Sequence, residues 1–142
     1  MLIGNGKKYL EACKKKVEEL KLSNRVRFLS NIPFDELPLF YQAADLFCFP
    51  SHFEGFGLPI VEALFSKTPV ITSLGSCFPE SAGPDSVYID PLSVADLAEK
   101  ITLVLNDVAL QERMITRGYD FVQQFHRQKV NEKLLECYAR LF

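Results

Sequence analysis

Short apolar runs alternate with amphipathic stretches as far as about residue 91, and the rest of the chain has helical periodicity. The apolar runs predict strands at about 2–3, 26–29, 46–49, 70–72 and 87–89. The run at 46–49 is nearly all apolar, as expected for a parallel strand that is covered on both faces. Strands that alternate with helices in this way indicate an α/β fold, a doubly wound, Rossmann-like parallel sheet flanked by helices.

Apolar residues at helical spacing predict helices at about 7–20, 35–43, 59–65, 93–105, 109–117 and from 127 onward. Asp35 and Ser93 suit the N-cap positions of two of these helices, because their side-chain oxygens can accept a backbone N–H. Gly118 is the expected end of the helix that begins near residue 109. The last helix carries an apolar stripe of Val130, Leu134, Leu135 and Tyr138. Since no linker or repeat is apparent, the elements are expected to form one compact unit.

Composition and charge narrow the function classes. A chain of 142 residues with a formal net charge of -2 fits one globular domain, and nothing supplies the basic face of a nucleic-acid binder. The cysteines stand singly, so we expect free thiols in a reducing compartment, with Cys13 and Cys48 in the interior. No apolar run approaches the length of a membrane span and no signal peptide is visible, which favours the cytoplasm. Any membrane contact is left to other parts of a longer protein.

Residues 51–63 hold the most informative motif, two carboxylates eight positions apart with glycines between them. Gly55 and Gly57 leave room for a ligand to approach backbone N–H groups. Pro59 suits the first helical position, and the helix N-terminus behind the glycines suits a phosphate. Glu62 falls within the first helical turn or just past it, and its side chain is expected to lean back toward that end.

The two acids lie on either side of the glycines, with Glu54 before the helix and Glu62 within it. A carboxylate accepts two hydrogen bonds from a vicinal diol, which is what a ribose or a hexose offers. The motif therefore favours a nucleotide sugar over a simple phosphate as the ligand.

The run Glu54-Gly-Phe-Gly-Leu-Pro-Ile-Val-Glu62 resembles the E-x-x-x-x-x-x-x-E signature of family 4 glycosyltransferases, which are retaining enzymes of the GT-B fold. Further segments are similar to landmarks of that family, in the family's order: 26–29, 35–41, 44–47, 50–51, 69–71, 79–80 and 89–91. The resemblance covers nearly the whole chain. It implies a C-terminal, donor-binding domain of such an enzyme.

The resemblance implies a role for each part of the motif. Glu54 is the expected catalytic residue, in contact with the transferred sugar near the reacting carbon, and Glu62 is expected to bind the ribose hydroxyls. Backbone N–H groups toward the sugar hydroxyls and phosphate are expected from four consecutive residues: Gly55, Phe56, Gly57 and Leu58. The alternatives for the two acids are a capping role for Glu54 and a favourable helix-dipole position for Glu62.

Four more positions are expected to bind substrate. Gly4 and Gly6 resemble the family's G-x-G on the diphosphate side, with a plain turn as the equal alternative. Ile32 either packs on the nucleobase or forms a hydrophobic staple with the following helix. Ser51 lies at the end of a strand, where α/β sheets bind ligands.

The resemblance also implies parts that precede this sequence in a full enzyme. These are an N-terminal acceptor domain and the first strand and helix of the donor-binding domain. In a sheet ordered 3-2-1-4-5-6 the first strand is central, so its absence leaves strand edges that invite self-association or pairing with another chain. The chain is accordingly either an excised part of a longer enzyme or a naturally short protein.

The expected function is retaining transfer of a sugar from a nucleotide diphosphate donor to an acceptor held by the N-terminal domain of the same enzyme. The resemblance implies no cofactor and no obligatory metal, and the absence of a D-x-D pair agrees with this. Lys7 and Lys8 either help to offset the donor's negative charge or are surface residues. Transfer by this chain alone is therefore not expected. The alternative is a non-catalytic nucleotide-binding or partner-assembly module.

Overall fold

The computed structural model describes residues 1–4 and 6–141, without the side chains of Lys7 and Lys8. Asn5 in the expected glycine turn, and the charge role considered for Lys7 and Lys8, therefore lie outside the described residues. The chain divides into two compact units, Met1–Leu37 and Pro38–Phe142, which are described in turn. That the two together form one donor-binding domain stays a prediction.

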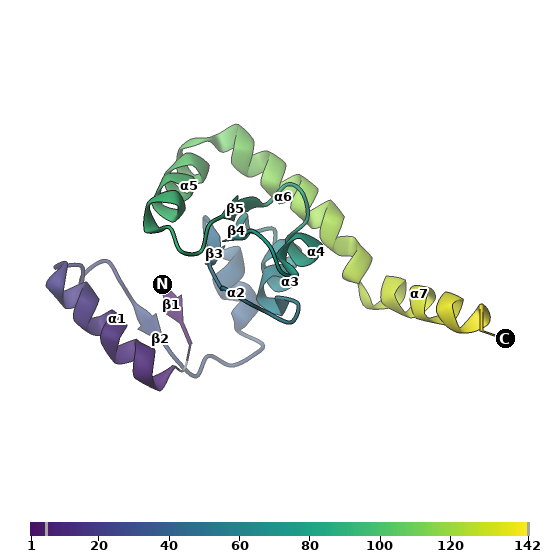
Figure 1. Cartoon of the computed structure of the whole chain (residues 1–142), viewed down its shortest axis with the longest axis horizontal. Coiled ribbons are helices and arrows are strands. Elements are labelled where there is room, and N and C mark those ends of the chain that lie inside the picture. The colour runs from purple at the N-terminus through teal and green to yellow at the C-terminus, as the bar shows by residue number, and fades with distance from the viewer. Residues whose placement is uncertain (5, 142) are drawn as a thin grey trace. The chain divides into compact units, whose positions relative to one another are not determined.

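The first unit is a β-α-β element in which β1 (Leu2–Ile3) and β2 (Phe28–Leu29) pair in parallel and are joined through α1 (Lys7–Glu19) (Figure 1). Both strands confirm the prediction, although β2 is shorter than the expected range 26–29. The amide of Val26 donates to the Leu22 carbonyl at 3.1 Å. Val26 thus closes a turn instead of extending the ladder.

The second unit is built on a parallel sheet with the order β3-β4-β5. The strands are β3 (Phe47–Phe49), β4 (Val70–Ser73) and β5 (Val87–Ile89). Cys48 aligns with Ile71, and Thr72 aligns with Tyr88. The orders β2-β1 and β3-β4-β5 match the 3-2 and 4-5-6 parts of the expected sheet, and the α/β fold class is confirmed.

Helices cover both faces of this sheet (Figure 1). The helical elements after the first unit's strands are α2 (Leu37–Gln42), α3 (Leu58–Phe65), α4 (Phe78–Ala82), α5 (Val94–Asn106), α6 (Val108–Val122), the 3₁₀ turn η1 (Gln123–Phe125) and α7 (Arg127–Ala139), of which α7 does not cover the sheet. Neighbouring residues of β4 join different clusters, because successive side chains of a strand point to opposite faces. Val70 packs with Ile60 of α3, whereas Ile71 packs with Val104 of α5 and Met114 of α6. The sheet is therefore doubly wound.

Helix α6 is longer than the sequence predicts, because Gly118 does not end it. Gly118 is buried, and a Cβ atom there would lie 2.7 Å from Cδ2 of Leu64 on α3. The glycine thus allows α6 to approach α3 closely. The predicted helix end at Gly118 is wrong, since a packing role between helices leaves no trace in local spacing.

The predicted caps and the short helix α4 had mixed outcomes. Ser93 caps α5, with its side chain accepting the Asp96 amide at 3.1 Å, as predicted. Asp35 does not directly precede α2, which begins at Leu37, and lies instead in the turn before it. Helix α4 has no counterpart among the predicted helices, because five residues are too few to show helical periodicity.

All four cysteines are free thiols, as their spacing predicts. Cys13 is exposed on α1, so its predicted burial is wrong. Cys48 is half-buried in β3, and burial raises the pKa of its thiol.

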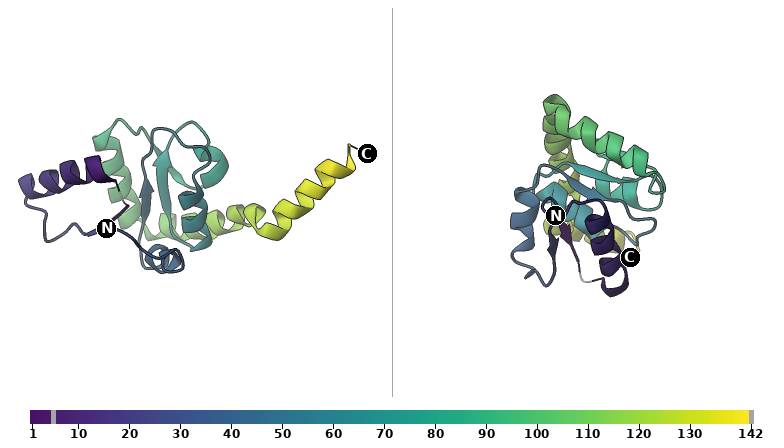
Figure 2. Two further views of the ribbon diagram at one scale, coloured as in Figure 1. Left: turned by 90° about the horizontal axis from the view of Figure 1, so that it is seen from below. Right: turned by 90° about the vertical axis from the view of Figure 1, so that its left-hand side faces the viewer.

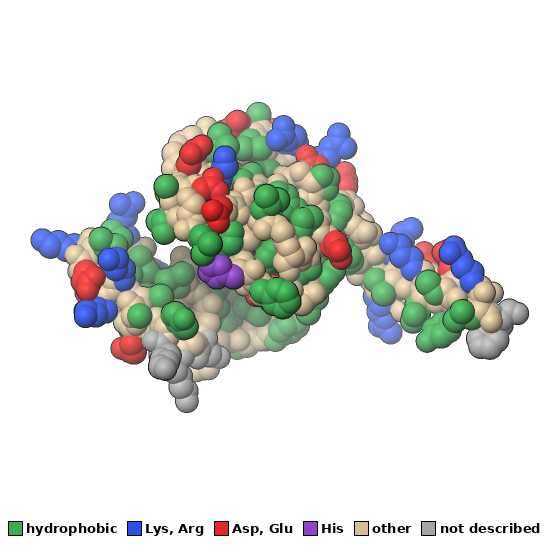
Figure 3. Space-filling model, in the orientation of Figure 1, with side chains coloured by type: hydrophobic (Ala, Val, Ile, Leu, Met, Phe, Trp, Pro, Cys, Tyr) green, Lys and Arg blue, Asp and Glu red, His purple; other side chains and the backbone are tan. Residues whose placement is uncertain are grey.

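Helix α7 extends from the rest of the second unit and has no buried residue (Figures 1 and 2). The predicted apolar stripe is present but open, with 44% of Val130, 52% of Leu134 and 55% of Tyr138 exposed. On the part of the molecule that Figure 1 labels α7, Figure 3 shows hydrophobic side chains beside Lys and Arg side chains. The helix therefore contributes no buried side chain to the hydrophobic core around the sheet.

Candidate functional site

The loop between β3 and α3 carries the first acid of the motif and is tied to the end of β4. Ser51 Oγ donates to Glu54 Oε1 at 2.9 Å and to the Phe53 carbonyl at 3.2 Å. The Ser51 carbonyl in turn accepts from Ser73 Oγ at 2.6 Å, and Ser73 is the last residue of β4. Ser51 therefore links the ends of two strands to the carboxylate of Glu54.

The backbone of Glu54 is held from the loop that follows β4. Its carbonyl accepts from Cys77 Sγ at 3.2 Å and from Ser76 Oγ at 3.4 Å. The Glu54 residue is half-buried. The N-cap position of α3 is occupied by Gly57, so the capping alternative for Glu54 is wrong.

The two glycines of the loop serve the fold differently. Gly57 has a φ of 88°, and a Cβ atom there would lie 3.1 Å from Ile60 Cδ1 and 3.2 Å from Ser81 Oγ. A Cβ atom at Gly55 would meet no described atom within 4 Å. Gly57 is therefore required by its backbone and its packing, whereas Gly55 leaves open space beside the loop, as the approach of a ligand requires.

Helix α3 begins one residue earlier than predicted, with Leu58 first and Pro59 second. Phe56 is half-buried, and its ring meets the Phe125 ring edge-on with 5.3 Å between centroids. Leu58 is 63% exposed. The middle of the loop is thus anchored on η1, while Gly55 before Phe56 and Leu58 two positions after it remain exposed.

Glu62 lies on the second turn of α3 and is held by a residue from a different element. The Tyr41 hydroxyl, on α2, donates to Glu62 Oε2 at 3.0 Å. No acidic residue lies in the first turn of α3, so the helix-dipole alternative does not explain Glu62. The structure therefore gives each acid of the motif one hydroxyl donor.

Tyr41 is itself fixed by two further contacts. Its ring meets the Phe47 ring edge-on with 5.1 Å between centroids, and its carbonyl accepts from Thr68 Oγ1 at 2.7 Å. Burial raises the pKa of Tyr41, and the hydrogen bond and negative charge of Glu62 raise it further. The hydroxyl consequently stays protonated and able to donate.

The sequence prediction did not include Tyr41 among the site residues. Its contact with Glu62 spans 21 positions, so no local motif contains both residues. The available signal was a tyrosine on a short helix just before an apolar strand, within the segment 35–41 that resembles a family landmark.

Three predicted substrate-binding residues, Gly4, Gly6 and Ile32, belong to the first unit. A Cβ atom at Gly4 or Gly6 would meet no described atom within 4 Å, and neither residue has the positive φ that favours glycine. The turn alternative includes Asn5, which lies outside the described residues, so it stays beside the ligand role. Ile32 is half-buried. The ligand roles of these three residues stay predictions.

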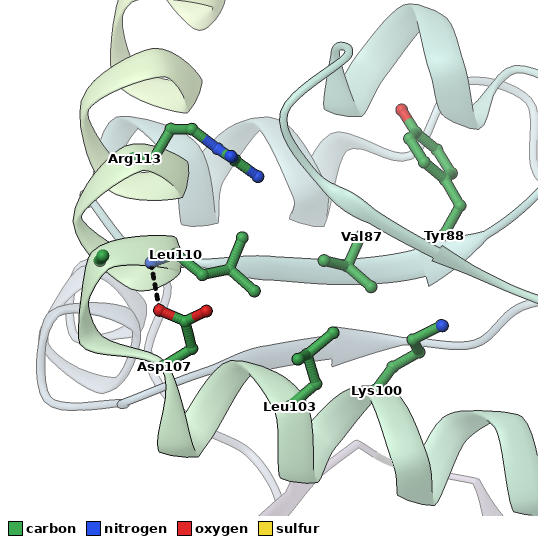
Figure 4. A pocket seen from close by; sticks show the side chains of 8 residues that line it. Val87, Tyr88, Lys100, Leu103, Asp107, Leu110 and Arg113 are labelled. Atoms are coloured by element: carbon green, nitrogen blue, oxygen red, sulfur yellow. Dashed lines mark hydrogen bonds between the residues drawn. The ribbon is translucent and has the colours of Figure 1, made fainter.

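A groove of about 580 Å³ lies elsewhere in the second unit, between β5, α5 and α6 (Figure 4). Val87 forms part of its apolar lining, and Lys100 and Arg113 reach it from α5 and α6. Asp107, between the two helices, accepts the Leu110 amide at 2.9 Å. Val87 is the first residue of β5, whereas the motif follows the carboxyl end of β3, so the groove and the motif are at different ends of the sheet.

Neither a membrane-spanning helix nor a cluster of metal ligands occurs within the described residues. None of the helices there combines the length and the hydropathy that crossing a bilayer requires. The same residues include no group of three or more His, Cys, Asp or Glu side chains placed to hold a metal ion.

The family model described as glycosyl transferases group 1 matches residues 1–121, which include both sheets and the whole motif. The chain belongs to this family. The group 1 glycosyltransferase domain therefore accounts for all the described strands and for helices α1 to α5.

A curated relative of this group 1 domain is O-antigen chain mannosyltransferase B of Escherichia coli. The two are 34% identical over 116 residues, which make up 82% of this chain and 30% of that protein. The chain thus spans a little under a third of the relative's length.

Two solved structures share the fold. The C-terminal domain of a glycosyl transferase group 1 family protein (LpcC) from Francisella tularensis has a TM-score of 0.73 and 31% identity, over 82% of this chain and 61% of that one. Anabaena Alr3699/HepE, in complex with UDP and glucose, has a TM-score of 0.87 over 98% of this chain and 40% of that one. At 24% identity this second likeness shows the fold alone. The fold is that of the C-terminal domain of GT-B glycosyltransferases.

Proposed function

We propose that this group 1 glycosyltransferase domain binds a nucleotide diphosphate sugar and that its full enzyme transfers the sugar, with retention, to an acceptor held by an N-terminal domain. The observation that carries the proposal is the placement of Glu54 and Glu62 around the glycine loop after β3, each with one carboxylate oxygen held by a hydroxyl. The similarity to a mannosyltransferase supports the transferase chemistry. The UDP in the complex of the Anabaena protein supports a nucleotide ligand.

Glu62 accepts hydrogen bonds from the ribose hydroxyls in this proposal. The Tyr41 hydroxyl occupies one acceptor position on Oε2, and a carboxylate has about four such positions, so Oε1 remains available for a vicinal diol. The diphosphate lies at the N-terminus of α3, where unpaired N–H groups and the helix dipole favour negative charge. The open space at Gly55 admits the ligand to the backbone.

The first unit keeps the roles that the family resemblance implies. Gly4 and Gly6 contact the diphosphate, and Ile32 packs on the nucleobase. The open space around a Cβ atom at Gly4 and Gly6 supports the first of these roles, since close approach to the backbone needs such space.

Glu54 acts on the transferred sugar. The bond from the anomeric carbon to the leaving phosphate oxygen breaks, the bond to the acceptor oxygen forms on the same face, and the acceptor's proton passes to the leaving phosphate. The Glu54 carboxylate stabilises the positive charge that develops on the sugar ring. Ser51 fixes the direction of that carboxylate through its bond to Oε1. The reaction uses no cofactor or metal ion, and this chain alone binds the donor without transferring the sugar.

Calorimetry with UDP, GDP and their hexose conjugates tests the binding part of the proposal. One of these ligands should bind, and Glu62→Ala should weaken its affinity by about tenfold or more, because hydrogen bonds to a charged group are lost. Glu112→Ala is the matched control, since Glu112 is an exposed glutamate on α6 of the same unit and should leave the affinity unchanged. Equal affinities for the wild type and Glu62→Ala would remove the ribose role.

Sugar transfer by the full natural protein tests the catalytic part. Release of the nucleoside diphosphate should depend on an acceptor, and the product should keep the donor's anomeric configuration in an NMR spectrum. Donor binding without any transfer in the full protein would instead support the non-catalytic nucleotide-binding module.

A further inference from the structure

Tyr41 meets Glu62 through a hydrogen bond that neither the motif nor the proposed reaction requires. The bond joins α2 to α3, with 3.0 Å between the hydroxyl oxygen and Oε2. The contact is partly buried, so water competes with it less than at an open surface. Tyr41 is therefore placed to influence the carboxylate without touching a ligand at the other oxygen.

Tyr41 lies on a helix of only six residues, yet other elements hold both its ring and its backbone. Its ring packs edge-on against Phe47 of β3, and its backbone carbonyl is held by Thr68, which is 2% exposed. These contacts come from the strand below and from the residues that lead into β4. The direction from which the hydroxyl approaches Glu62 is thus set by the core.

We propose that Tyr41 is a positioning residue that orients the Glu62 carboxylate, so that its free oxygen accepts the vicinal diol of the ribose. This inference rests on the proposed function, because it assigns Glu62 to the ribose. A glutamate on a helix has several rotamers, and the diol accepts few of them. A fixed donor on one carboxylate oxygen selects among these rotamers before the ligand arrives, which lowers the cost of binding.

The protonation state of Tyr41 suits this task. Burial first, and then the bond to and charge of Glu62, raise the pKa of the phenol well above its ordinary value. The hydroxyl remains a donor throughout the neutral and mildly alkaline range. Tyr41 can therefore act as the positioning donor over that whole range.

A purely structural role for the contact makes a different prediction. If the Tyr41–Glu62 bond only ties α2 to α3, its loss lowers the stability of the fold and weakens every nucleotide equally. If Tyr41 positions Glu62, loss of the hydrogen bond weakens the binding of the ribose hydroxyls. The affinity for a ligand that lacks one of these hydroxyls is then little changed. Discrimination between ribose and 2′-deoxyribose thus separates the two roles.

The experiment measures the affinities of UDP and 2′-deoxy-UDP, and of GDP and 2′-deoxy-GDP, by calorimetry. The proteins are the wild type, Tyr41→Phe, Glu62→Ala and the double variant. Tyr41→Phe keeps the ring that packs on Phe47, so the variant should fold. It should lower the affinity for the ribonucleotide by about three- to tenfold and the affinity for the deoxynucleotide by less than about twofold. In the Glu62→Ala background the same substitution should change neither affinity.

Tyr88→Phe is the matched control. Tyr88 is also half-buried, and its hydroxyl donates at 2.5 Å to the carbonyl of Gly83, which is not part of the motif. This variant loses a partly buried hydrogen bond that a tyrosine hydroxyl donates to a backbone carbonyl, so it should lower the unfolding temperature while keeping the ribose preference of the wild type.

The outcomes separate the inference from the function on which it rests. An unchanged ribose preference in Tyr41→Phe, or an equal effect in both backgrounds, overturns the positioning role while Glu62→Ala still reports on the ribose. No ribose preference in the wild type, together with no effect of Glu62→Ala, overturns the proposed function itself.

Discussion

The two acids of the motif are held in different ways. Glu54 lies on a loop and is fixed by Ser51, three residues before it, and by backbone contacts from the loop after β4. Glu62 lies on a helix and is fixed by Tyr41, which is 21 positions away in the sequence. A side chain on a packed helix is placed more accurately than one on a loop. Glu62 therefore suits a constant binding contact, and Glu54 suits a group that responds as charge develops.

Removing the charge of Glu54 should produce the largest effect and is the strongest challenge to this comparison. Glu54→Gln keeps the size of the side chain, yet it should lower the turnover number of the full enzyme by about 10²- to 10³-fold, as losses of charge-stabilising groups do. The affinity for the nucleoside diphosphate should change by less than about twofold, because the proposed function assigns Glu54 to the sugar and not to the nucleotide.

Steady-state kinetics and calorimetry on the same variant provide the two readouts. Glu62→Ala is the reciprocal variant, because it should lose mainly affinity for the nucleoside diphosphate and less of the turnover number. If Glu54→Gln lost affinity and turnover in equal proportion, the two acids would share one role, and the distinction between loop and helix would have no functional meaning.

The glycines between the acids extend the comparison to stability. Gly57→Ala should lower the free energy of unfolding by about 1–3 kcal/mol, because its positive φ strains an alanine and its Cβ atom would crowd Ile60 and Ser81. Gly55→Ala should cost less than about 0.5 kcal/mol, since its Cβ atom would meet open space. Urea denaturation measures both values.

The binding affinities of the same two variants complete the test. Gly55→Ala should fold normally and still weaken the nucleotide sugar, because the added methyl group fills the space through which a ligand reaches the backbone. A Gly55→Ala variant with the affinity of the wild type would place the ligand elsewhere.

The hydrophobic pattern predicted most elements because each strand and long helix carries its own local signal. The apolar run at 87–89 and the cap at Ser93 are recovered in the structure without change. Strand β2 is shorter than predicted, because the amide of Val26 is used in a turn. Where the strand begins depends on the hydrogen-bond partner of one N–H group, and the hydrophobic pattern carries no information about that partner.

The features that the sequence did not predict have the same origin, which is contact between distant residues. Gly57 and Gly55 look alike in the sequence, and their difference depends on Ser81 of α4 and on the φ angle of Gly57. Gly118 was predicted to end a helix because the residue that requires a glycine there, Leu64, lies on α3. Tyr41 was missed because its partner lies on another helix. The motif gives the residue types of the site, whereas the tertiary contacts decide which neighbours support them.

Ser51→Ala should produce the smallest effect and test how tightly the loop acid needs to be held. The substitution removes the hydroxyl that donates to Glu54 Oε1 but keeps the carbonyl that accepts from Ser73. Because Cys77 and Ser76 still hold the Glu54 backbone, turnover should fall by only about two- to fivefold, with little change in stability. Ser51→Thr keeps a hydroxyl at this position and should restore most of the turnover. A Ser51→Ala variant that lost nucleotide affinity instead would show that Glu54 is held for binding in the same way as Glu62.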